Sequence, residues 1–306
     1  MIELIDEVKV QNELGEGVIW DSFMQRAWWT DIDQCRLFRY DPISKELESW
    51  ETPERLACFA PVAINGERQA YLIAAFASGF AYYQPETGQV EWIKKIETDN
   101  PGTRLNDGRT DRQGRFWAGS MVEDKEIAVD KGKLYRLNRN LSISATIDNL
   151  QITNSLCWSP DSKTVYHADT PTRKINSYSY DTETGQLTMP HVFTKTENDC
   201  YPDGSIVDSQ GYLWNAQWGG SKVVRYKPDG NIDLSLDLPV SQVTCVAFGG
   251  RDLNLLLVTT AHQDLDTEQR QKEPRAGNFF VFKTDFTGLI ESPFTPTSRL
   301  DAMRSS

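Results

Sequence analysis

The chain has 306 residues, of which 39% are hydrophobic and 25% are charged, a composition typical of globular proteins. No run of residues approaches the roughly 18 consecutive apolar positions of a membrane-spanning helix. The formal net charge of −12 argues against a nucleic-acid phosphate backbone as a partner.

The N-terminal segment and the cysteines bear on where the protein works. Residues 1–10 are acidic and alternating, and they lack the basic start and apolar core of a signal peptide. The five cysteines form no CxxC pair and leave an odd count, which favours a reducing compartment. We therefore expect a cytoplasmic protein, a monomer or weak homodimer, with neither membrane nor nucleic acid as partner.

A repeated pattern runs through the whole chain. A polar or small residue lies five positions before a tight turn, and this arrangement recurs every 41 to 49 residues. We call these residues the anchors; they are Glu16, Ala60, Asn106, Asn154, Asp203 and Thr244. A period of this length built from short strands is typical of a β-propeller.

The predicted strands follow the anchors in a constant order. Residues 2–10 come before the first anchor, and we expect them to form an outer strand of the last blade and so close the ring. A second strand of each repeat is predicted at residues 27–30, 70–74, 115–118, 164–167, 212–215 and 254–259. A third is predicted at residues 36–40, 79–83, 133–137, 174–180, 222–226 and 278–283. A fourth closes most repeats, as at residues 47–50 and 90–93.

These elements predict one all-β domain over residues 1–306, a six-bladed β-propeller with four-stranded blades closed by the N-terminal strand. No amphipathic helix longer than two turns is expected. Because the anchors begin the innermost strands, they should lie at one mouth of the central channel. The loops between second and third strands open at the same mouth, and the longest of these covers residues 261–276.

Four anchors carry side-chain oxygens and should converge near the axis: Glu16, Asn106, Asn154 and Asp203. Two carboxylates and two amides form a hard ligand set that suits Ca²⁺, Mg²⁺ or Mn²⁺. None of the three histidines is an anchor, so a multi-histidine zinc site is not expected, although zinc bound through oxygens stays among the candidates. Asn and Asp at strand starts also serve simply as turn caps, but four of six anchors favour a site.

Other motifs point to packing or are missing. The sequence contains no G-x-S-x-G nucleophile elbow and no phosphate-binding P-loop. His167 and Cys157 are expected in the core, and Gly108 and Gly204 are expected to meet backbone requirements. Trp218 lies in a mouth loop and is a candidate ligand contact.

Several sequence blocks together resemble the regucalcin (senescence marker protein)/gluconolactonase family. They occur in family order and span nearly the whole chain: LGEGVIW (14–20), RLNDG (104–108), GRFWAGSM (114–121), ITNSLCWS (152–159), PDG (202–204) and DSQGYLW (208–214). The chain departs from the family at Ser155, where Gly is more common after the asparagine. The mouth loops match no assignable pattern.

The resemblance implies a propeller with one divalent metal ion and sugar-lactone hydrolase activity. By match to the motifs, Glu16, Asn154 and Asp203 would hold the metal, and Asp203 would also be the general base. Arg104 and Asn106 would contact the substrate. An acidic substrate contact falls at Glu123 or Asp124, and counting from Arg104 favours Asp124.

The sequence thus predicts hydrolysis of an aldonolactone to its open acid. A bound metal would polarise the carbonyl, and Asp203 would accept a proton from the attacking water. Two alternatives remain at this point. One is a hydrolase acting on organophosphates or other esters, and the other is a non-enzymatic calcium-binding or scaffold propeller.

Overall fold

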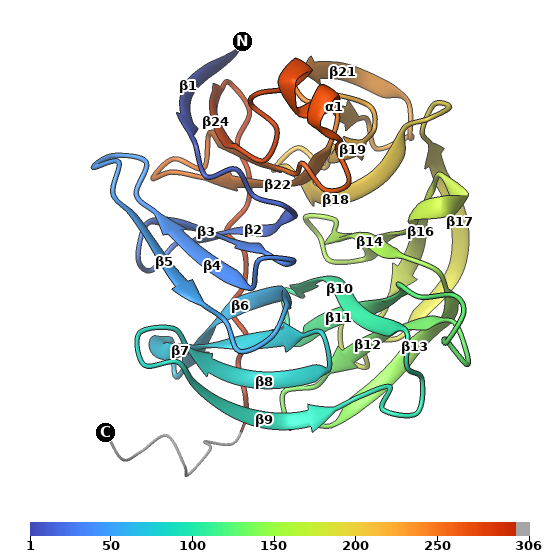
Figure 1. Cartoon of the computed structure of the whole chain (residues 1–306). Coiled ribbons are helices and arrows are strands. Elements are labelled where there is room, and N and C mark those ends of the chain that lie inside the picture. The colour runs from blue at the N-terminus through green and yellow to red at the C-terminus, as the bar shows by residue number, and fades with distance from the viewer. Residues whose placement is uncertain (298–306) are drawn as a thin grey trace.

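The computed structural model describes residues 1–297. Six four-stranded antiparallel sheets are arranged as blades around a central axis (Figure 1). Blade 1 contains β2 (Gly15–Asp21), β3 (Arg26–Asp31), β4 (Arg36–Tyr40) and β5 (Leu47–Glu51). Blade 2 contains β6 (Leu56–Ile64), β7 (Glu67–Phe76), β8 (Gly79–Gln84) and β9 (Gln89–Lys95). Blade 3 contains β10 (Thr103–Thr110), β11 (Phe116–Val122), β12 (Gly132–Leu137) and β13 (Ile143–Leu150).

The other three blades repeat the same order, innermost strand first. Blade 4 contains β14 (Thr153–Trp158), β15 (Thr164–Asp169), β16 (Lys174–Tyr180) and β17 (Leu187–Lys195). Blade 5 contains β18 (Tyr201–Val207), β19 (Leu213–Trp218), β20 (Lys222–Tyr226) and β21 (Ile232–Asp237). Blade 6 contains β22 (Val243–Gly249), β23 (Leu255–Thr260), β24 (Phe279–Thr284) and, from the other end of the chain, β1 (Ile2–Val8).

The ring closes as the sequence predicts. β1 pairs antiparallel with β24 and is the outermost strand of blade 6. Glu7 of β1 accepts hydrogen bonds from Arg275 and Asn278, which lie just before β24. The two ends of the chain therefore share one blade, so the first and last repeats cannot separate without breaking this sheet.

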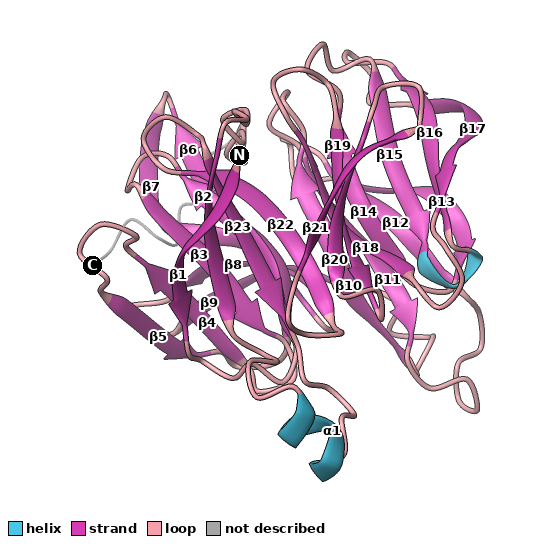
Figure 2. Cartoon of the chain, turned by 90° about the horizontal axis from the view of Figure 1, so that it is seen from above, coloured by secondary structure: helices cyan, strands magenta, loops and turns pink. Residues whose placement is uncertain are grey.

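Helix is confined to two short pieces among residues 1–297, η1 (Thr170–Thr172) and α1 (Thr267–Lys272), as Figure 2 shows. α1 lies inside the predicted loop of residues 261–276 and begins with a capping box between Asp266 and Gln269. Within the described part of the chain, no helix has the length and apolarity to cross a membrane.

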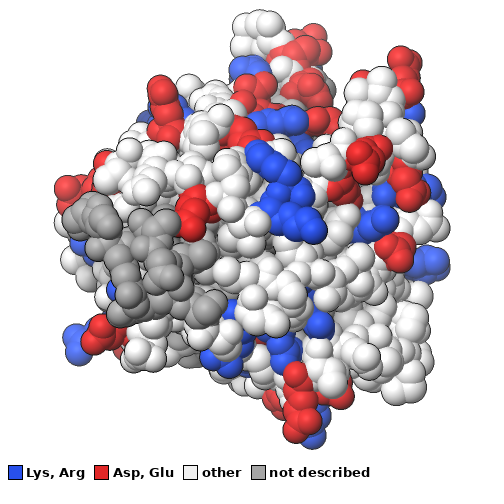
Figure 3. Space-filling model, turned by 90° about the horizontal axis from the view of Figure 1, so that it is seen from below, with Lys and Arg blue, Asp and Glu red and all other residues white. Residues whose placement is uncertain are grey.

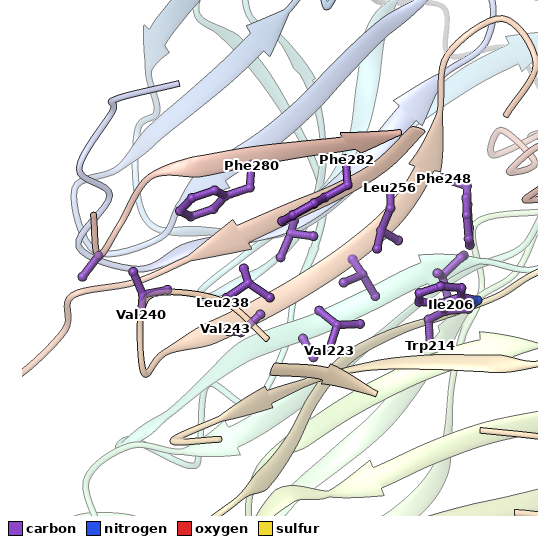
Figure 4. Packing of buried hydrophobic residues seen from close by; sticks show 14 residues of the cluster. Ile206, Trp214, Val223, Leu238, Val240, Val243, Phe248, Leu256, Phe280 and Phe282 are labelled. Atoms are coloured by element: carbon purple, nitrogen blue, oxygen red, sulfur yellow. The ribbon is translucent and has the colours of Figure 1, made fainter. Parts of the chain in front are cut away.

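Most of the apolar core lies between neighbouring blades. In Figure 4, Trp214 and Val223 of blade 5 face Phe248, Leu256 and Phe282 of blade 6 across the gap between the two sheets. The alternation of side chains along each strand produces this packing, because successive residues point to opposite faces of a blade. Burying these faces fixes each blade against the next and holds the innermost strands around the axis.

The turns at the far end of the channel are held by repeated aspartates. The Asp111 carboxylate accepts from the backbone N–H of Gln113 and Arg115 and from the indole of Trp117. Asp208 makes the same set of contacts, including one to Trp214 Nε1 at 3.0 Å. In blades 3 and 5, the D-x-x-G turn therefore fastens the hairpin of the two inner strands to the core of its own blade.

Near the channel mouth, each innermost strand has one extra residue relative to its neighbour. These β-bulges follow Glu16, Leu56, Leu105, Asn154, Pro202 and Val243. A bulge turns a side chain away from its ordinary strand direction, and bulges are common beside active sites. Five anchors lie within these bulges or at their edges.

The remaining anchor prediction, Ala60 in blade 2, is wrong. In blade 2 the bulge lies at Ala57, so Ala57 is the residue equivalent to the other anchors. β6 has nine residues, so counting back five positions from its turn stops too far along the strand. Ala60 pairs with Ile73 and lines a small cavity at the far end of the channel.

A C-terminal segment, residues 285–297, crosses the far end of the ring, and we call it the strap. It appears in Figure 1 as the red segment running behind the blades toward the C-terminus. Its backbone bonds to several blades: Thr287 O accepts from Ser209, Gly288 donates to Leu253 O, Phe294 bonds with Pro61 and Ala63, and Thr295 donates to Gly114 O. No repeated pattern in the sequence predicts this element.

Charges on the surface are mixed. Acidic and basic side chains alternate among uncharged ones on the face shown in Figure 3. The net charge of −12 is therefore not concentrated into one acidic surface on this side of the molecule.

Candidate active site at the channel mouth

A cavity of about 320 Å³ opens at the channel mouth. It collects four predicted site residues with oxygen-bearing side chains, together with Arg104 and an apolar wall. Its lining consists of Leu14, Glu16, Arg104, Asn106, Met121, Ile152, Asn154, Thr170, Pro171, Tyr201, Asp203, Trp218 and Gln263. The loops between second and third strands contribute to it, as the sequence predicts.

Two carboxyls lie at its base. Glu16 and Asp203 are 7% and 5% exposed, and their side chains are within hydrogen-bonding reach of each other. Burial, together with the charge of Asp107, raises the pKa of Glu16 to about 8. Burial and the neighbouring Glu16 raise the pKa of Asp203 well above its ordinary value. Two buried carboxylates side by side favour either a shared proton or a bound cation.

The pair is poorly supplied with hydrogen-bond donors. Asp203 Oδ1 is buried and has no hydrogen-bond partner within residues 1–297, and Glu16 accepts a bond from the N–H of Gly17 at 3.0 Å. An unpaired buried carboxylate oxygen is costly in a folded protein. This oxygen therefore identifies a place where a cation or a protic group would be stabilising.

Two asparagines complete this side of the cavity. Asn154 Nδ2 donates to Thr170 Oγ1 at 2.8 Å, which fixes the orientation of the amide. Asn106 Nδ2 donates to Thr153 O at 2.9 Å and approaches Asn154 Oδ1 at 3.4 Å. Asn106 Oδ1 accepts from Arg104 at 2.9 Å. The amide oxygen of Asn106 is thus already occupied, whereas that of Asn154 has only one long contact.

Ser155, the departure from the family pattern, has a definite structural role. Its backbone is left-handed with φ of 61°, the conformation that favours glycine. Its hydroxyl donates to Asp203 O at 2.6 Å and accepts from Ser205 and Asn215. The serine therefore ties the bulge of blade 4 to the strand that carries Asp203.

Arg104 belongs to a charged group at the rim. It is buried, which lowers its pKa, and its Nε donates to Glu123 Oε1 at 3.1 Å. Arg55 holds the other side of the Glu123 carboxylate, with Nη2 at 2.8 Å from Oε2. The bond from Arg55 lowers the pKa of Glu123, so this carboxylate stays ionised at the rim.

Asp124 lies elsewhere. Its side chain is exposed and caps a local turn by accepting from the N–H of Glu126. Counting along the chain could not separate it from Glu123, because both residues follow the end of β11, where no regular alternation sets the direction of a side chain. Glu123 is therefore the acidic residue that the structure brings to Arg104.

Sequence reasoning missed Asp107, a third carboxylate below the pair. It is buried, which raises its pKa, and it acts electrostatically on both Glu16 and Asp203. The signal was available, because Asp107 follows Asn106 directly in a block already identified. It was overlooked because it is not itself an anchor position.

The remaining sequence predictions concern packing. Thr244 is buried and its hydroxyl donates to Gly15 O, so it supports the strand beside Glu16. Cys157 and His167 are both buried, as expected. A Cβ atom at Gly108 would lie 2.1 Å from Trp117 O, and one at Gly204 would lie 2.5 Å from Cys245 Sγ. Close approach of neighbouring strands therefore requires both glycines.

The donor set fits a hard divalent cation. Among residues 1–297, no group of three or more His, Cys, Asp or Glu side chains is arranged to hold a metal ion. A set of two carboxylates and one amide, Glu16, Asp203 and Asn154, would leave room for water or substrate oxygens in the other positions. The unpartnered Asp203 oxygen supports this fit.

Comparison with known proteins places the chain in a family. Residues 14–262 match the model of the SMP-30/gluconolactonase/LRE-like region. The chain is 36% identical to an L-arabinolactonase of Azospirillum brasilense over 291 residues, covering 94% of each protein. It is 32% identical to a 6-deoxy-6-sulfogluconolactonase of Pseudomonas putida, covering 94% of this chain and 97% of the other.

A solved structure agrees with these matches. The calcium-binding protein regucalcin from Agrobacterium tumefaciens superposes with a TM-score of 0.88 at 30% identity, covering 97% of this chain and 98% of that one. The sequence match, the fold and the shared coverage lead to one conclusion: the chain belongs to the SMP-30/gluconolactonase/LRE-like family.

Proposed function

We propose that this protein is a metal-dependent sugar lactonase that opens an aldonolactone to the aldonic acid. The observation that carries the proposal is the buried Glu16–Asp203 pair, open to a cavity of about 320 Å³ and short of hydrogen-bond donors. Relatives named L-arabinolactonase and 6-deoxy-6-sulfogluconolactonase support a sugar lactone as substrate.

Glu16, Asn154 and Asp203 would hold one divalent ion. Their oxygens suit Ca²⁺, Mg²⁺ or Mn²⁺, with Zn²⁺ as a further candidate, and the calcium-binding regucalcin supports Ca²⁺. When bound, such an ion supplies positive charge that polarises the lactone carbonyl and stabilises the oxyanion.

Asp203 is the general base in this proposal. One of its carboxylate oxygens accepts a proton from water as the water oxygen bonds to the lactone carbonyl carbon. The bond from that carbon to the ring oxygen then breaks, and the ring oxygen takes the proton held by Asp203 to become a hydroxyl, which returns Asp203 to its ionised form. Asp203 has two oxygens, so one can face the ion while the other faces the water.

The rim residues orient the substrate. Arg104 and Glu123 present a donor and an acceptor to sugar hydroxyls, and Asn106 holds Arg104 in place while presenting its amide edge. Glu123 replaces Asp124 as the acidic contact because only Glu123 lies against Arg104. Trp218 and Tyr201 form an apolar wall against which a sugar ring face can pack.

The cellular setting is part of the same proposal. All five cysteines are free thiols, which supports the cytoplasm, and we propose a monomer or weak homodimer there.

A pH-drop assay against a panel of aldonolactones tests the function. The protein is assayed with chelator and then with each of Ca²⁺, Mg²⁺, Mn²⁺ and Zn²⁺, beside simple esters and organophosphates. We expect turnover of one or more sugar lactones that chelation abolishes and metal restores. Turnover of only esters or organophosphates would favour a different hydrolase. Metal binding without any turnover would favour a non-enzymatic calcium-binding propeller.

A further inference from the structure

A line of buried charges runs from the proposed metal site to the strap. We call Asp107, Arg109 and Glu291 the charge column. Asp107 and Arg109 are two residues apart on the innermost strand of blade 3, so both point to the same side of that strand. Arg109 Nη2 approaches Cys245 Sγ at 3.9 Å, and a Cβ atom at Gly204, next to Asp203, would lie 2.5 Å from the same sulfur. The guanidinium therefore lies close to the strand that carries Asp203, and its charge acts to lower the pKa of Asp107.

Glu291 reaches this column from the strap. Its carboxylate forms an ion pair with Arg109, and the two side chains are only 14% and 9% exposed. Glu291 Oε2 also accepts from the backbone N–H of Trp20 at 3.4 Å, which ties the same carboxylate to blade 1. Arg109 Nη2 approaches Val246 O at 3.5 Å. A strap residue is thus inserted between three inner strands.

The strap leaves almost no space around this contact. Two cavities lined by both Arg109 and Glu291 measure only about 30 and 10 Å³. Arg109 therefore has little freedom to move while the strap is in place. If Glu291 were neutral, the guanidinium of Arg109 would pair instead with water or with one of the carboxylates near the mouth.

We propose that Glu291, by holding Arg109 toward the far end of the channel, sets the affinity of the mouth for its divalent cation. Glu291 and Arg109 are positioning residues here, because neither touches the proposed ligands. The inference rests on the proposed metal site, but it does not depend on which substrate is hydrolysed. Under this proposal the C-terminal strap helps to set the metal affinity of the mouth, besides closing the far end of the channel.

Charge substitution along the column tests the inference. Metal affinity is measured by calorimetric titration of Ca²⁺ and Mn²⁺ into the chelator-treated full chain, with circular dichroism to confirm folding. E291Q should weaken binding about tenfold, because it removes the negative charge that offsets the positive charge of Arg109 near the carboxylates. R109Q should strengthen binding, because it removes the positive charge near the carboxylates.

The double variant R109Q/E291Q separates electrostatics from simple loosening of the strap. It should bind metal several-fold more tightly than E291Q, whereas damage to the strap would persist in the double variant. Asp285→Asn provides a matched charge change at the exposed start of the strap, and its affinity should stay within about twofold of wild type.

The affinities of these variants decide whether the charge column sets the metal affinity. Equal affinity of wild type and E291Q, or no recovery in the double variant, would overturn the role of the charge column while leaving the lactonase proposal intact. An absence of metal binding by the wild-type chain would overturn both the metal site and this inference. If R109Q fails to fold, E291Q and Asp285→Asn still decide the question.

Discussion

The two ends of the channel are built from the same strands but differ in how their polar groups are satisfied. At the mouth, Glu16 and Asp203 lie side by side, the charge of buried Asp107 acts on both, and an oxygen of Asp203 has no hydrogen-bond partner among residues 1–297. At the far end, the Arg109–Glu291 ion pair is covered by the strap, and the turn aspartates accept several bonds each.

The fold thus places the residues for chemistry at the mouth and the contacts that stabilise the ring at the far end. Unsatisfied carboxylates destabilise the ring unless a ligand arrives, so they are confined to the end that is open. Saturated turns and the strap stabilise the ring from the closed end. We expect substitutions at the two ends to affect different measurements.

The largest effect is expected from Asp203→Asn at the mouth. The amide preserves shape but cannot accept a proton from water, so kcat should fall about a thousandfold or more. Melting of the chelated protein should not be lowered, because one of two adjacent buried charges is removed. Near-wild-type kcat in this variant, measured on the best lactone, would refute the assignment of the base.

Phe294→Ala removes packing contacts at the closed end of the channel. Phe294 is fully buried in the core between blades 2 and 3, so its removal should cost about 3–5 kcal/mol of unfolding free energy. Denaturant unfolding measures this loss. For the fraction that remains folded, kcat should stay within a few-fold of wild type. A thousandfold loss of kcat without a loss of stability would abolish the contrast between the two ends.

The pH dependence of stability should reveal the carboxyl pair. The pKa of Glu16 is raised from 4.5 to about 8 in the folded chain. Between these two pH values the folded state therefore keeps a proton on Glu16 that the unfolded chain releases. Stability of the chelated protein should therefore fall as pH rises from about 5 to 8. Ca²⁺ should oppose the fall, because it takes the place of the protons.

The check is the melting temperature across this pH range, with chelator and with Ca²⁺. Glu16→Gln should flatten the slope seen with chelator, since only one carboxyl of the pair remains. A melting temperature that climbs with pH in the chelated wild type would contradict the proposed origin of the effect.

At the rim, Glu123→Gln and Asp124→Asn form a matched pair of adjacent substitutions. The first alters the carboxylate that Arg104 and Arg55 hold, and it should raise KM about tenfold or more. The second alters an exposed turn cap and should leave KM almost unchanged. Steady-state kinetics on one lactone compares them, and the reverse order would restore Asp124 as the substrate contact.

The smallest effect is expected at Ser155, where two substitutions separate strain from hydrogen bonding. Ser155→Gly relieves the left-handed backbone but loses the bond to Asp203 O, whereas Ser155→Ala loses the bond and keeps the strain. The alanine variant should be less stable than the glycine variant by about 1 kcal/mol. Equal stabilities in denaturant unfolding would show that the backbone there is not strained.

Much of the fold could be read from the sequence because local signals repeat. The D-x-x-G turns, the alternating strands and the period of 41 to 49 residues all follow from short-range chemistry. Blade 2 shows the limit. Its inner strand is longer than the others, so a count from the turn selected Ala60 in place of Ala57.

The site was only partly predictable for the same reason. The repeat predicted that Glu16, Asn106, Asn154 and Asp203 would converge, because they are its oxygen-bearing anchors. The family resemblance then implied that Glu16, Asn154 and Asp203 hold the metal. The choice between Glu123 and Asp124 depends on the path of the chain just after β11, and Arg55 reaches Glu123 from the connection between blades 1 and 2. Asp107 gained its importance only from its burial beside two other carboxyls.

The sequence by itself determined the ring, its closure by the N-terminal segment and the four oxygen-bearing anchors gathered at the mouth, because these depend on strand periodicity and turn chemistry. Only the tertiary structure decided the bulges that aim the anchors, the pairing of Glu123 with Arg104, and the strap that brings Glu291 to Arg109. Those features arise between residues as many as 182 positions apart, and no local pattern encodes such contacts.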